Sequence, residues 1–501
     1  MKRPNNDGSN PSAEVAEGGR PAKENARQTT ASRFQDRSDA SSDLARVREA
    51  AIRDKRMRFT SLLHYVTVER LREAYRALNP KAAPGVDQVT WGDYGKTLED
   101  RLHELKDRVH RGTYRAQPSR RTYIPKADGK MRPLGIASLE DKIVQQALVT
   151  VLNQIYEVDF LGFSYGMRPG RSQHKALDAL WVAFMEQKKV NWVLDADLRG
   201  FFDSIDHQWM MKFLEHRIAD RRVLRLIQKW LRAGVSEDGE WSKSTKGTPQ
   251  GAVISPLLAN VYLHYVLDLW IKKWRLKTAH GDVAIIRYAD DFVVGFEHRL
   301  DAVRFSRELS ERLTKFGLEL HSEKTRLIEF GRFAALNRDR RGEGKPETFT
   351  FLGFTHSCTR SGSRPTGIIR RRTVRKRLVS KLHEVKLELR KRRHQPVATQ
   401  GSWLRSVVQG FFNYHAVPTN FEVLPRFRNE VARHWFRSLR RRSQRARRGL
   451  TWERFYPLAN RWLPRPRILH PYPNDRFYRQ HPRWEPYAGN PHVRICPGGA
   501  R

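Results

Sequence analysis

Two short apolar runs that carry aspartates constrain the fold of this chain more than any other feature. The first, residues 193–207, reads VLDADLRGFFDSIDH, and the second, residues 284–296, reads AIIRYADDFVVGF. Each starts as a buried strand would, and the second predicts a β-hairpin. Burial of an unpaired carboxylate is costly, and adjacent carboxylates repel one another. A fold that buries both segments together therefore needs something that neutralises the acids.

Divalent cations are the neutralising group that these residue types favour. Asp195 and Asp197 share one strand face because side chains alternate with a period of two, and Asp290 and Asp291 follow in the hairpin. Mg²⁺ prefers oxygen ligands and binds carboxylates together with substrate phosphates. Two such ions about 4 Å apart can activate an attacking hydroxyl and stabilise a leaving oxygen. The pattern predicts a two-metal phosphoryl-transfer site; the alternative for YADD alone is a polar turn facing solvent.

The charge balance indicates a polyanionic partner. The 501 residues include 95 Lys and Arg against 54 Asp and Glu, a formal net charge of +41, and residues 361–470 hold 28 Lys and Arg against 5 Glu. Repulsion among so many positive charges is relieved when a polyanion binds. Nucleic acid is the first candidate for this partner, and an anionic membrane surface is the second. No apolar run reaches the length of a transmembrane helix, and the N-terminus lacks a secretory signal. Cys358 and Cys496 form neither a zinc pattern nor a disulfide framework.

Composition divides the chain into five stretches. Residues 1–50 are polar and predict a disordered tail. Residues 51–104 have helical spacing, and residues 105–360 mix helical patterns with β-rich runs, which predicts an α+β fold. Residues 361–470 predict basic amphipathic helices with no further strands, and the first of them carries Val385 and Leu389 on its apolar face. Residues 471–501, rich in Pro, Arg and aromatic residues, predict an extended tail.

Several motifs, taken in order, resemble a known family. DADLRGFFDSIDH, KGTPQGAVISPLLANVYLHYVLD and RYADDFVVGF resemble the palm of reverse transcriptases. The motif order, from APGVDQVTW at residue 83 through YIPKADGKMRPL, GFSYGMRPG, LELHSEKTRLIEFG and FTFLGF to RILHPYP at residue 473, resembles the proteins encoded by group II introns. Those proteins are reverse transcriptases and maturases. The resemblance implies a right-hand polymerase fold, with fingers and palm followed by a helical thumb or maturase (X) domain.

The resemblance also implies roles at the catalytic centre. Asp197, Asp290 and Asp291 would form the catalytic triad that holds two Mg²⁺ ions, with help from the backbone carbonyl of Leu198. Phe202, five residues after Asp197, would be the steric gate that excludes a ribose 2′-hydroxyl. The alternative for Phe202 is ordinary core packing, which we expect for Phe201. Asp206, which precedes an amphipathic stretch, should cap the helix that follows it.

Other positions match the nucleotide contacts of the family. Lys126 and Arg132 would clamp the triphosphate of a deoxynucleotide, since cations neutralise phosphate charge. Gln250 would lie against the nascent base pair, and Gly251 would allow close backbone approach. Lys324 would protonate the departing pyrophosphate. The alternatives are solvated surface cations for Lys126 and Arg132 and simple turn chemistry for Gln250 and Gly251.

The implied partners are a cognate group II intron RNA, a DNA target and primer, and deoxynucleoside triphosphates, with no membrane and no obligate protein partner. The run RSLRRRSQRARR should contact RNA phosphates, because like charges this dense repel one another unless they are occupied. Its cations are Arg437, Arg440, Arg441, Arg442, Arg445, Arg447 and Arg448. The aromatic residues nearby, Trp403, Phe411 and Phe412, should pack in the core of the thumb. We see no counterpart of the family's C-terminal DNA endonuclease domain, and we expect a cytoplasmic bacterial ribonucleoprotein.

Two other functions stay open at this point. A splicing-only maturase with an inactive polymerase fold would show substituted acids, and the triad is intact. A domesticated reverse transcriptase used in defence, repair or diversity generation would share the polymerase motifs, although retron-like proteins generally lack the maturase region. The sequence therefore favours an RNA-directed DNA polymerase and RNA-splicing maturase of a mobile group II intron.

Overall fold

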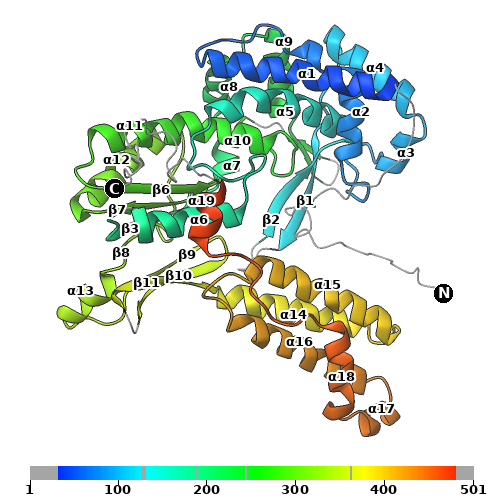
Figure 1. Cartoon of the computed structure of the whole chain (residues 1–501). Helices are drawn as coiled ribbons and strands as arrows, with labels where there is room; N and C mark the ends of the chain where they lie inside the picture. Colours follow the sequence, from blue (N-terminus) through cyan, green and yellow to red (C-terminus); the bar gives the residue numbers. More distant parts are fainter. Residues whose placement is uncertain are drawn as a thin grey trace. The chain divides into compact units, whose positions relative to one another are not determined.

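The computed structural model describes residues 32–125, 131–187, 189–237, 240–242, 245–361 and 364–480 (Figure 1). These residues form an α+β protein with three sheets, as the sequence predicts. The chain divides into two compact units. The first contains residues up to 158 together with 217–244 and 249–253, and the second contains residues 159–216, 245–248 and 254 onward.

The first unit combines helices with a four-stranded sheet of order β2-β1-β4-β5. Its strands are β1 (Ser119–Pro125), β2 (Met131–Ile136), β4 (Val235–Glu237) and β5 (Glu240–Ser242). Its helices are α1 (Ser32–Arg53), α2 (Val68–Ala77), α3 (Trp91–Gly95), α4 (Leu98–Arg111), α5 (Leu139–Asp159) and α9 (Arg221–Arg232), with the short η2 (Leu63–Tyr65). Because α4 runs through residue 104, the structure has no boundary at the position where the sequence placed one.

The prediction of a disordered tail is wrong for residues 32–50, which belong to α1. Three apolar side chains in the later turns of this helix, Leu44, Val47 and Ala51, recur at helical spacing and are buried. Arg217 binds the end of this helix: its guanidinium donates to the carbonyl oxygens of Ala51 at 3.4 Å and Asp54 at 3.0 Å. The polar composition therefore concealed a narrow apolar stripe. Residues 1–31 lie outside the described residues.

The second unit is built on an antiparallel sheet of order β6-β7-β3-β8. These strands are β3 (Trp192–Ala196), β6 (Val283–Tyr288), β7 (Asp291–Phe296) and β8 (Arg326–Glu329). Most side chains of β6 and β7 are buried, which agrees with the apolar runs and confirms the predicted hairpin. The accompanying helices are α6 (Gln173–Val182), η3 (Ala183–Gln187), α7 (Phe201–Ser204), α8 (His207–Glu215), α10 (Ser255–Leu263), η4 (His264–Asp268), α11 (Leu269–Lys277), α12 (Arg299–Thr314) and α13 (Ala334–Arg340).

A second sheet in this unit corrects the predicted start of the helical region at residue 361. β9 (Thr348–Phe351), β10 (Phe354–Ser361) and β11 (Arg364–Thr373) pair in the order β11-β10-β9, and the first thumb helix begins only at Arg375. The strand pattern of β11 was missed because it contains consecutive arginines. One of them, Arg371, is buried with only 2% of its side chain exposed, since Asp178 on α6 accepts a hydrogen bond from it at 3.2 Å.

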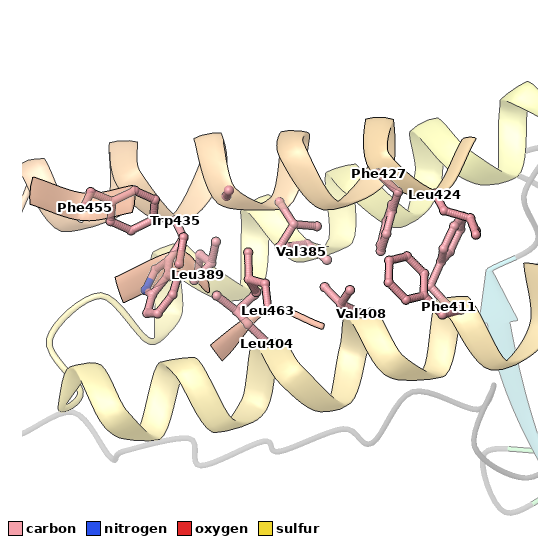
Figure 2. Close-up of a cluster of buried hydrophobic side chains, with 14 of the residues drawn as sticks. Val385, Leu389, Leu404, Val408, Phe411, Leu424, Phe427, Trp435, Phe455 and Leu463 are labelled. Carbon is pink, nitrogen blue, oxygen red and sulfur yellow. The ribbon is translucent and has the colours of Figure 1, made fainter. Parts of the chain in front are cut away.

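The helices after β11 enclose a separate apolar core, which Figure 2 shows in close-up. They are α14 (Arg375–Lys391), α15 (Val397–His415), α16 (Val423–Arg440), α17 (Gln444–Gly449) and α18 (Trp452–Trp462). Phe411 and Phe427 stack with ring centroids 3.8 Å apart, and the buried Trp435 indole donates to Gln400 at 2.9 Å. The core positions predicted for Phe411 and Phe412 are confirmed, while Trp403 packs at the edge of this core.

The prediction of an extended C-terminal tail is wrong for residues 473–480. They form α19 (Pro473–Gln480), which packs on α6. Arg476 of α19 forms an ion pair with Asp178, and His470 stacks on His174 with ring centroids 4.0 Å apart. The tail is thus fixed by polar partners that its composition did not reveal. Residues 481–501 lie outside the described residues.

Candidate active site

The two acidic segments meet at one end of the second unit's main sheet. β3 and β7 are neighbouring antiparallel strands in which Asp195 pairs with Val293 and Ala196 with Phe292. Continuing this register by one residue places Asp197 opposite Asp291. The structure therefore brings together the strand ends that the sequence predicted to be neighbours.

A two-residue turn presents the remaining aspartate. Tyr288 pairs with Asp291 across the β6–β7 hairpin, so Ala289 and Asp290 form its tip. Ala289 has a φ of 56°, a left-handed conformation that non-glycine residues rarely adopt. Strained backbone of this kind persists only where the surroundings impose it. The turn is therefore held in place by its neighbours, which places Asp290 beside the end of β3.

Electrostatics show that the carboxylates crowd one another. The pKa of Asp291 is raised to about 7, first by loss of solvent and then by the charges of Asp290, Asp197 and Asp195. The pKa of Asp195 is raised to about 6 by burial, which the charge of Asp197 reinforces and Arg326 opposes. The Asp291 side chain still reaches solvent. Of these two causes of the raised pKa, the repulsion among the carboxylates is the one that a bound cation would remove.

Lys324 occupies the position next to Asp197 that a cation would favour. Its ammonium nitrogen lies 2.5 Å from Asp197 Oδ2. The loop that carries it is held against the end of β3, because His321 N donates to Asp197 O at 2.8 Å and Arg199 N donates to Glu319 O at 2.9 Å. Leu198, whose carbonyl was predicted to assist a metal, is buried and bridges to Leu320 of the same loop. The predicted proton-donor role of Lys324 stays a prediction.

The donor set fits a hard divalent cation. Three aspartates gather at the ends of β3 and β7, and their crowding is the condition that magnesium-type ions relieve. Within the ranges that the structure describes, no three acidic, histidine or cysteine side chains are placed so that together they could hold a metal ion. The residue types therefore suit a divalent cation, while one of the three carboxylates is paired with Lys324.

Phe202 differs in burial from its neighbour Phe201. Phe201 is buried, with 2% of its surface exposed, whereas Phe202 is only partly buried. The two rings meet edge to face with centroids 5.4 Å apart. Asp206, which begins the next helix, accepts a hydrogen bond from Trp209 N at 2.9 Å, which confirms the predicted N-cap. The core alternative thus applies to Phe201 and leaves Phe202 available at the surface.

Three of the predicted nucleotide contacts, Arg132, Gln250 and Gly251, belong to the first unit. Gly251 has a φ of 110°, and a Cβ there would lie 2.9 Å from the carbonyl oxygen of Gly135, so only glycine fits. Gly135 N donates to Gln250 O at 2.7 Å, which fixes the turn against β2. Arg132 lies exposed on β2. All four residues belong to the first unit, whereas the aspartates belong to the second. Lys126 lies outside the described residues.

Sequence reasoning missed the polar group behind the aspartate turn. Arg287 lies within the apolar strand β6 and is fully buried, with Asp268 as its ion-pair partner at 2.6 Å. An arginine inside an otherwise apolar run was the available signal, because a charged residue in that setting requires a buried partner. Its partners come from distant parts of the chain and could not be read from the motif.

The predicted RNA-contacting arginines lie at the end of α16 and around α17. The exposed ones are Arg437, Arg440, Arg441, Arg445, Arg447 and Arg448. Arg442 differs, because it is half-buried and its guanidinium donates to the carbonyl oxygens of Arg393, at 2.6 Å, and of Gln395. We therefore assign Arg442 to the fold and keep the other six as candidate phosphate contacts.

A hollow of about 600 Å³ lies on the same helical domain. Its sides include Trp403, which stacks with Arg392 at 5.0 Å from ring centroid to guanidinium carbon, and Trp462. Short side chains line the rest, namely Ala398, Thr399, Ser402 and Ser406. Both indoles are partly buried, and indoles beside arginines suit stacking with nucleic-acid bases where they reach the surface.

Comparison with known proteins defines the class first. The family described as reverse transcriptase (RNA-dependent DNA polymerase) matches residues 124–356, which contain the aspartates, Phe202 and Lys324. The chain is 36% identical over 315 residues to protein YkfC of Escherichia coli, an alignment that covers 55% of this chain and 81% of that protein. It is therefore a reverse transcriptase, with the right-hand polymerase fold of that class.

Further relatives specify the family. The group II intron-encoded protein LtrA of Lactococcus lactis is 36% identical over 230 residues, which cover 46% of this chain and 33% of LtrA. The putative COX1/OXI3 intron 1 protein of Saccharomyces cerevisiae is 29% identical over 364 residues, which cover 62% of this chain and 41% of that protein. This chain belongs to the family of group II intron-encoded reverse transcriptases and maturases, as the motif order predicted. Within the described residues, no helix is long and apolar enough to cross a membrane.

Proposed function

We propose that this protein copies group II intron RNA into DNA by two-metal nucleotidyl transfer and also assists the splicing of that RNA. The observation that carries the polymerase part is the β3–β7 register, which puts Asp197 opposite Asp291 beside the Asp290 turn. The raised pKa of Asp291 adds support, because crowded carboxylates favour a bound cation. The proposed substrates are deoxynucleoside triphosphates, a DNA primer and an RNA template.

The proposed roles follow from where each side chain lies. Asp197, Asp290 and Asp291 would hold two Mg²⁺ ions, which supply activation of the primer 3′-hydroxyl and stabilisation of the leaving oxygen. Lys324, now paired with Asp197, would release that carboxylate and donate its proton to the pyrophosphate that departs. Phe202, partly exposed just beyond Asp197, would exclude a 2′-hydroxyl by contact with the sugar.

Primer extension on an RNA template tests the polymerase proposal. We expect wild-type protein to extend a DNA primer with deoxynucleotides and Mg²⁺, and Asp290→Ala to lose at least 100-fold in rate, on the order of what one electrostatic stabiliser contributes. Asp203→Ala is the matched control, because Asp203 is an exposed acid of α7 outside the triad. The proposal fails if wild-type protein extends nothing, or if Asp290→Ala extends as fast as Asp203→Ala.

The splicing part is supported by the basic surface around α17 and by the hollow that the partly buried indoles of Trp403 and Trp462 line. Phosphate contacts supply affinity that falls steeply with salt, and stacking adds contributions independent of sequence. We expect the protein to accelerate splicing of its cognate intron at low Mg²⁺. We also expect Asp290→Ala to retain this effect, and a variant with Arg445, Arg447 and Arg448 changed to Gln to lose it. An arginine variant that splices as well as wild type would contradict the assignment of this surface.

A further inference from the structure

Arg287 is a buried polar hub directly behind the turn that carries Asp290. An arginine side chain has five N–H donors, and in Arg287 five hydrogen bonds occupy them. Two go to the carboxylate of Asp268 at 2.8 and 2.6 Å, and one goes to Ser164 Oγ at 2.7 Å. The remaining two are shared by Asn260 Oδ1 at 3.1 Å and the carbonyl oxygen of Ala289 at 3.0 Å. A side chain with every donor satisfied in this way has one allowed position.

The partners of Arg287 are themselves fixed. Asp268 ends a π-helical turn, η4, between α10 and α11, and its side chain is fully buried. π-Helical turns inside α-helices often occur at functional sites. Asn260 lies one helical segment earlier, and its amide nitrogen donates to Gly166 O at 2.9 Å. The backbone of Arg287 is also tied to residues 163–165, since Tyr165 N donates to Arg287 O at 2.8 Å and Arg287 N donates to Phe163 O at 2.9 Å.

Gly166, which accepts the hydrogen bond from Asn260, also packs against the backbone of the turn. Gly166 packs so tightly that a Cβ there would overlap the backbone nitrogen of Ala289 and would lie 2.8 Å from the carbonyl carbon of Tyr288. Ala289 is therefore held at its carbonyl oxygen by Arg287 and at its nitrogen side by Gly166. These contacts account for the left-handed conformation of Ala289, which a free turn would relax.

We propose that Arg287 is a positioning residue, which with Asp268, Asn260 and Gly166 sets the place of Asp290 and Asp291 relative to Asp197. None of these four touches the reacting atoms in this role. The contribution is geometric, because a catalytic group displaced by about 1 Å can cost on the order of 100-fold in rate. The proposal rests on the proposed polymerase function and names a part of its machinery that the aspartate motif does not contain.

A purely structural role makes a different prediction, and the same unit offers a matched control. Arg371 and Asp178 form another buried ion pair, with 2% and 1% of their side chains exposed, on β11 and α6. Neither of them contacts the Ala289–Asp290 turn through a hydrogen bond among the described residues. If buried ion pairs in this unit served stability alone, apolar replacement of either pair would have equal consequences for catalysis.

The test compares Arg287→Lys and the double variant Arg287→Met/Asp268→Leu with the control Arg371→Met/Asp178→Leu. Each is assayed below its own unfolding midpoint for kcat, for KM of the template–primer and for the Mg²⁺ concentration at half-maximal rate. We expect the Arg287 variants to lose on the order of 100-fold in kcat, with little change in template–primer KM and a several-fold higher Mg²⁺ requirement. The control should keep the wild-type Mg²⁺ requirement.

Gly166→Ala serves as a second variant that leaves every polar partner in place. It displaces the turn by steric overlap alone, so we expect the same rise in Mg²⁺ requirement. In the Arg287 and Gly166 variants, hydrogen exchange of the peptide spanning residues 284–296 should be faster than in wild type and in the control. The proposal is overturned if folded Arg287 and Gly166 variants keep the wild-type kcat and Mg²⁺ requirement, or if the control shifts both equally. Wild-type protein without extension activity would instead overturn the proposed function itself.

Discussion

Replacing Asp178 with alanine removes the carboxylate that Arg371 and Arg476 share. Asp178 has 1% of its side chain exposed, Arg371 2% and Arg476 16%. Both arginines would lose their charged partner, and Arg371 has no path to solvent because it points inward from β11. The α6, β11 and α19 segments would then be held together by apolar contacts around an uncompensated buried charge.

The expected loss follows from burial. Breaking a buried ion pair by removing one partner costs about 3–5 kcal/mol, because the remaining charge stays desolvated. Arg476→Met keeps Asp178 paired with the deeper arginine and should cost less, about 1.5–3 kcal/mol, the range for a hydrogen bond to a charged group. The double variant Asp178→Leu/Arg371→Met removes both charges of the deeper pair. It should recover at least half of the Asp178→Ala loss, since apolar replacement of a buried pair is often close to neutral.

Urea unfolding monitored by tryptophan fluorescence measures these free energies. Limited proteolysis between residues 464 and 480 reports whether α19 has left α6. We expect Asp178→Ala to have the lowest unfolding midpoint and the fastest cleavage in this segment. The reasoning is refuted if Asp178→Ala is no less stable than Arg476→Met, or if the double variant is the least stable of the three.

Two other outcomes follow from individual side chains. Phe202→Val should lower discrimination against ribonucleotides by about 10- to 200-fold, the range for a missing hydrocarbon contact. Primer extension with ribonucleotides and with deoxynucleotides measures this discrimination. The control Phe201→Leu should lower the stability of the protein and leave sugar selection unchanged. Burial lowers the pKa of His264 to about 4 and of His356 to about 3. The unfolded chain therefore binds more protons than the native state below pH 6.5, so stability present above that pH should fall by about 2 kcal/mol per histidine at pH 5. Urea unfolding at pH 7.5 and 5 checks this, and a pH dependence unaltered in His356→Leu would contradict it.

Local pattern was sufficient wherever the determining interactions lie close together in sequence. The hairpin of residues 284–296 was predicted because its apolar runs alternate around a two-residue turn, and the structure forms it as β6 and β7. Asp206 was predicted as an N-cap from its place before an amphipathic helix, and it accepts the hydrogen bond expected of a cap. The amphipathic spacing of α14 likewise identified the buried positions Val385 and Leu389.

Composition misled where a minority of residues decides the structure. The stretch before residue 50 looked disordered, yet three buried apolar side chains suffice for α1 to pack. β11 was hidden by its arginines, and α19 by proline and charge. In each case the stabilising partner lies elsewhere in the chain, as with Asp178 and Arg476, which are 298 residues apart.

By itself, the sequence determined the class of protein, because the polymerase motifs are contiguous stretches of chain, and it predicted which acidic residues would form the proposed site. Only the tertiary structure decided which carboxylate faces which, that Lys324 pairs with Asp197, and that Arg287 reaches Ser164 across 123 residues of sequence. The physical reason is that a buried charge is tolerated only with its full set of partners. Folding brings those partners together from segments that are far apart in the chain, so local sequence patterns do not predict the contacts.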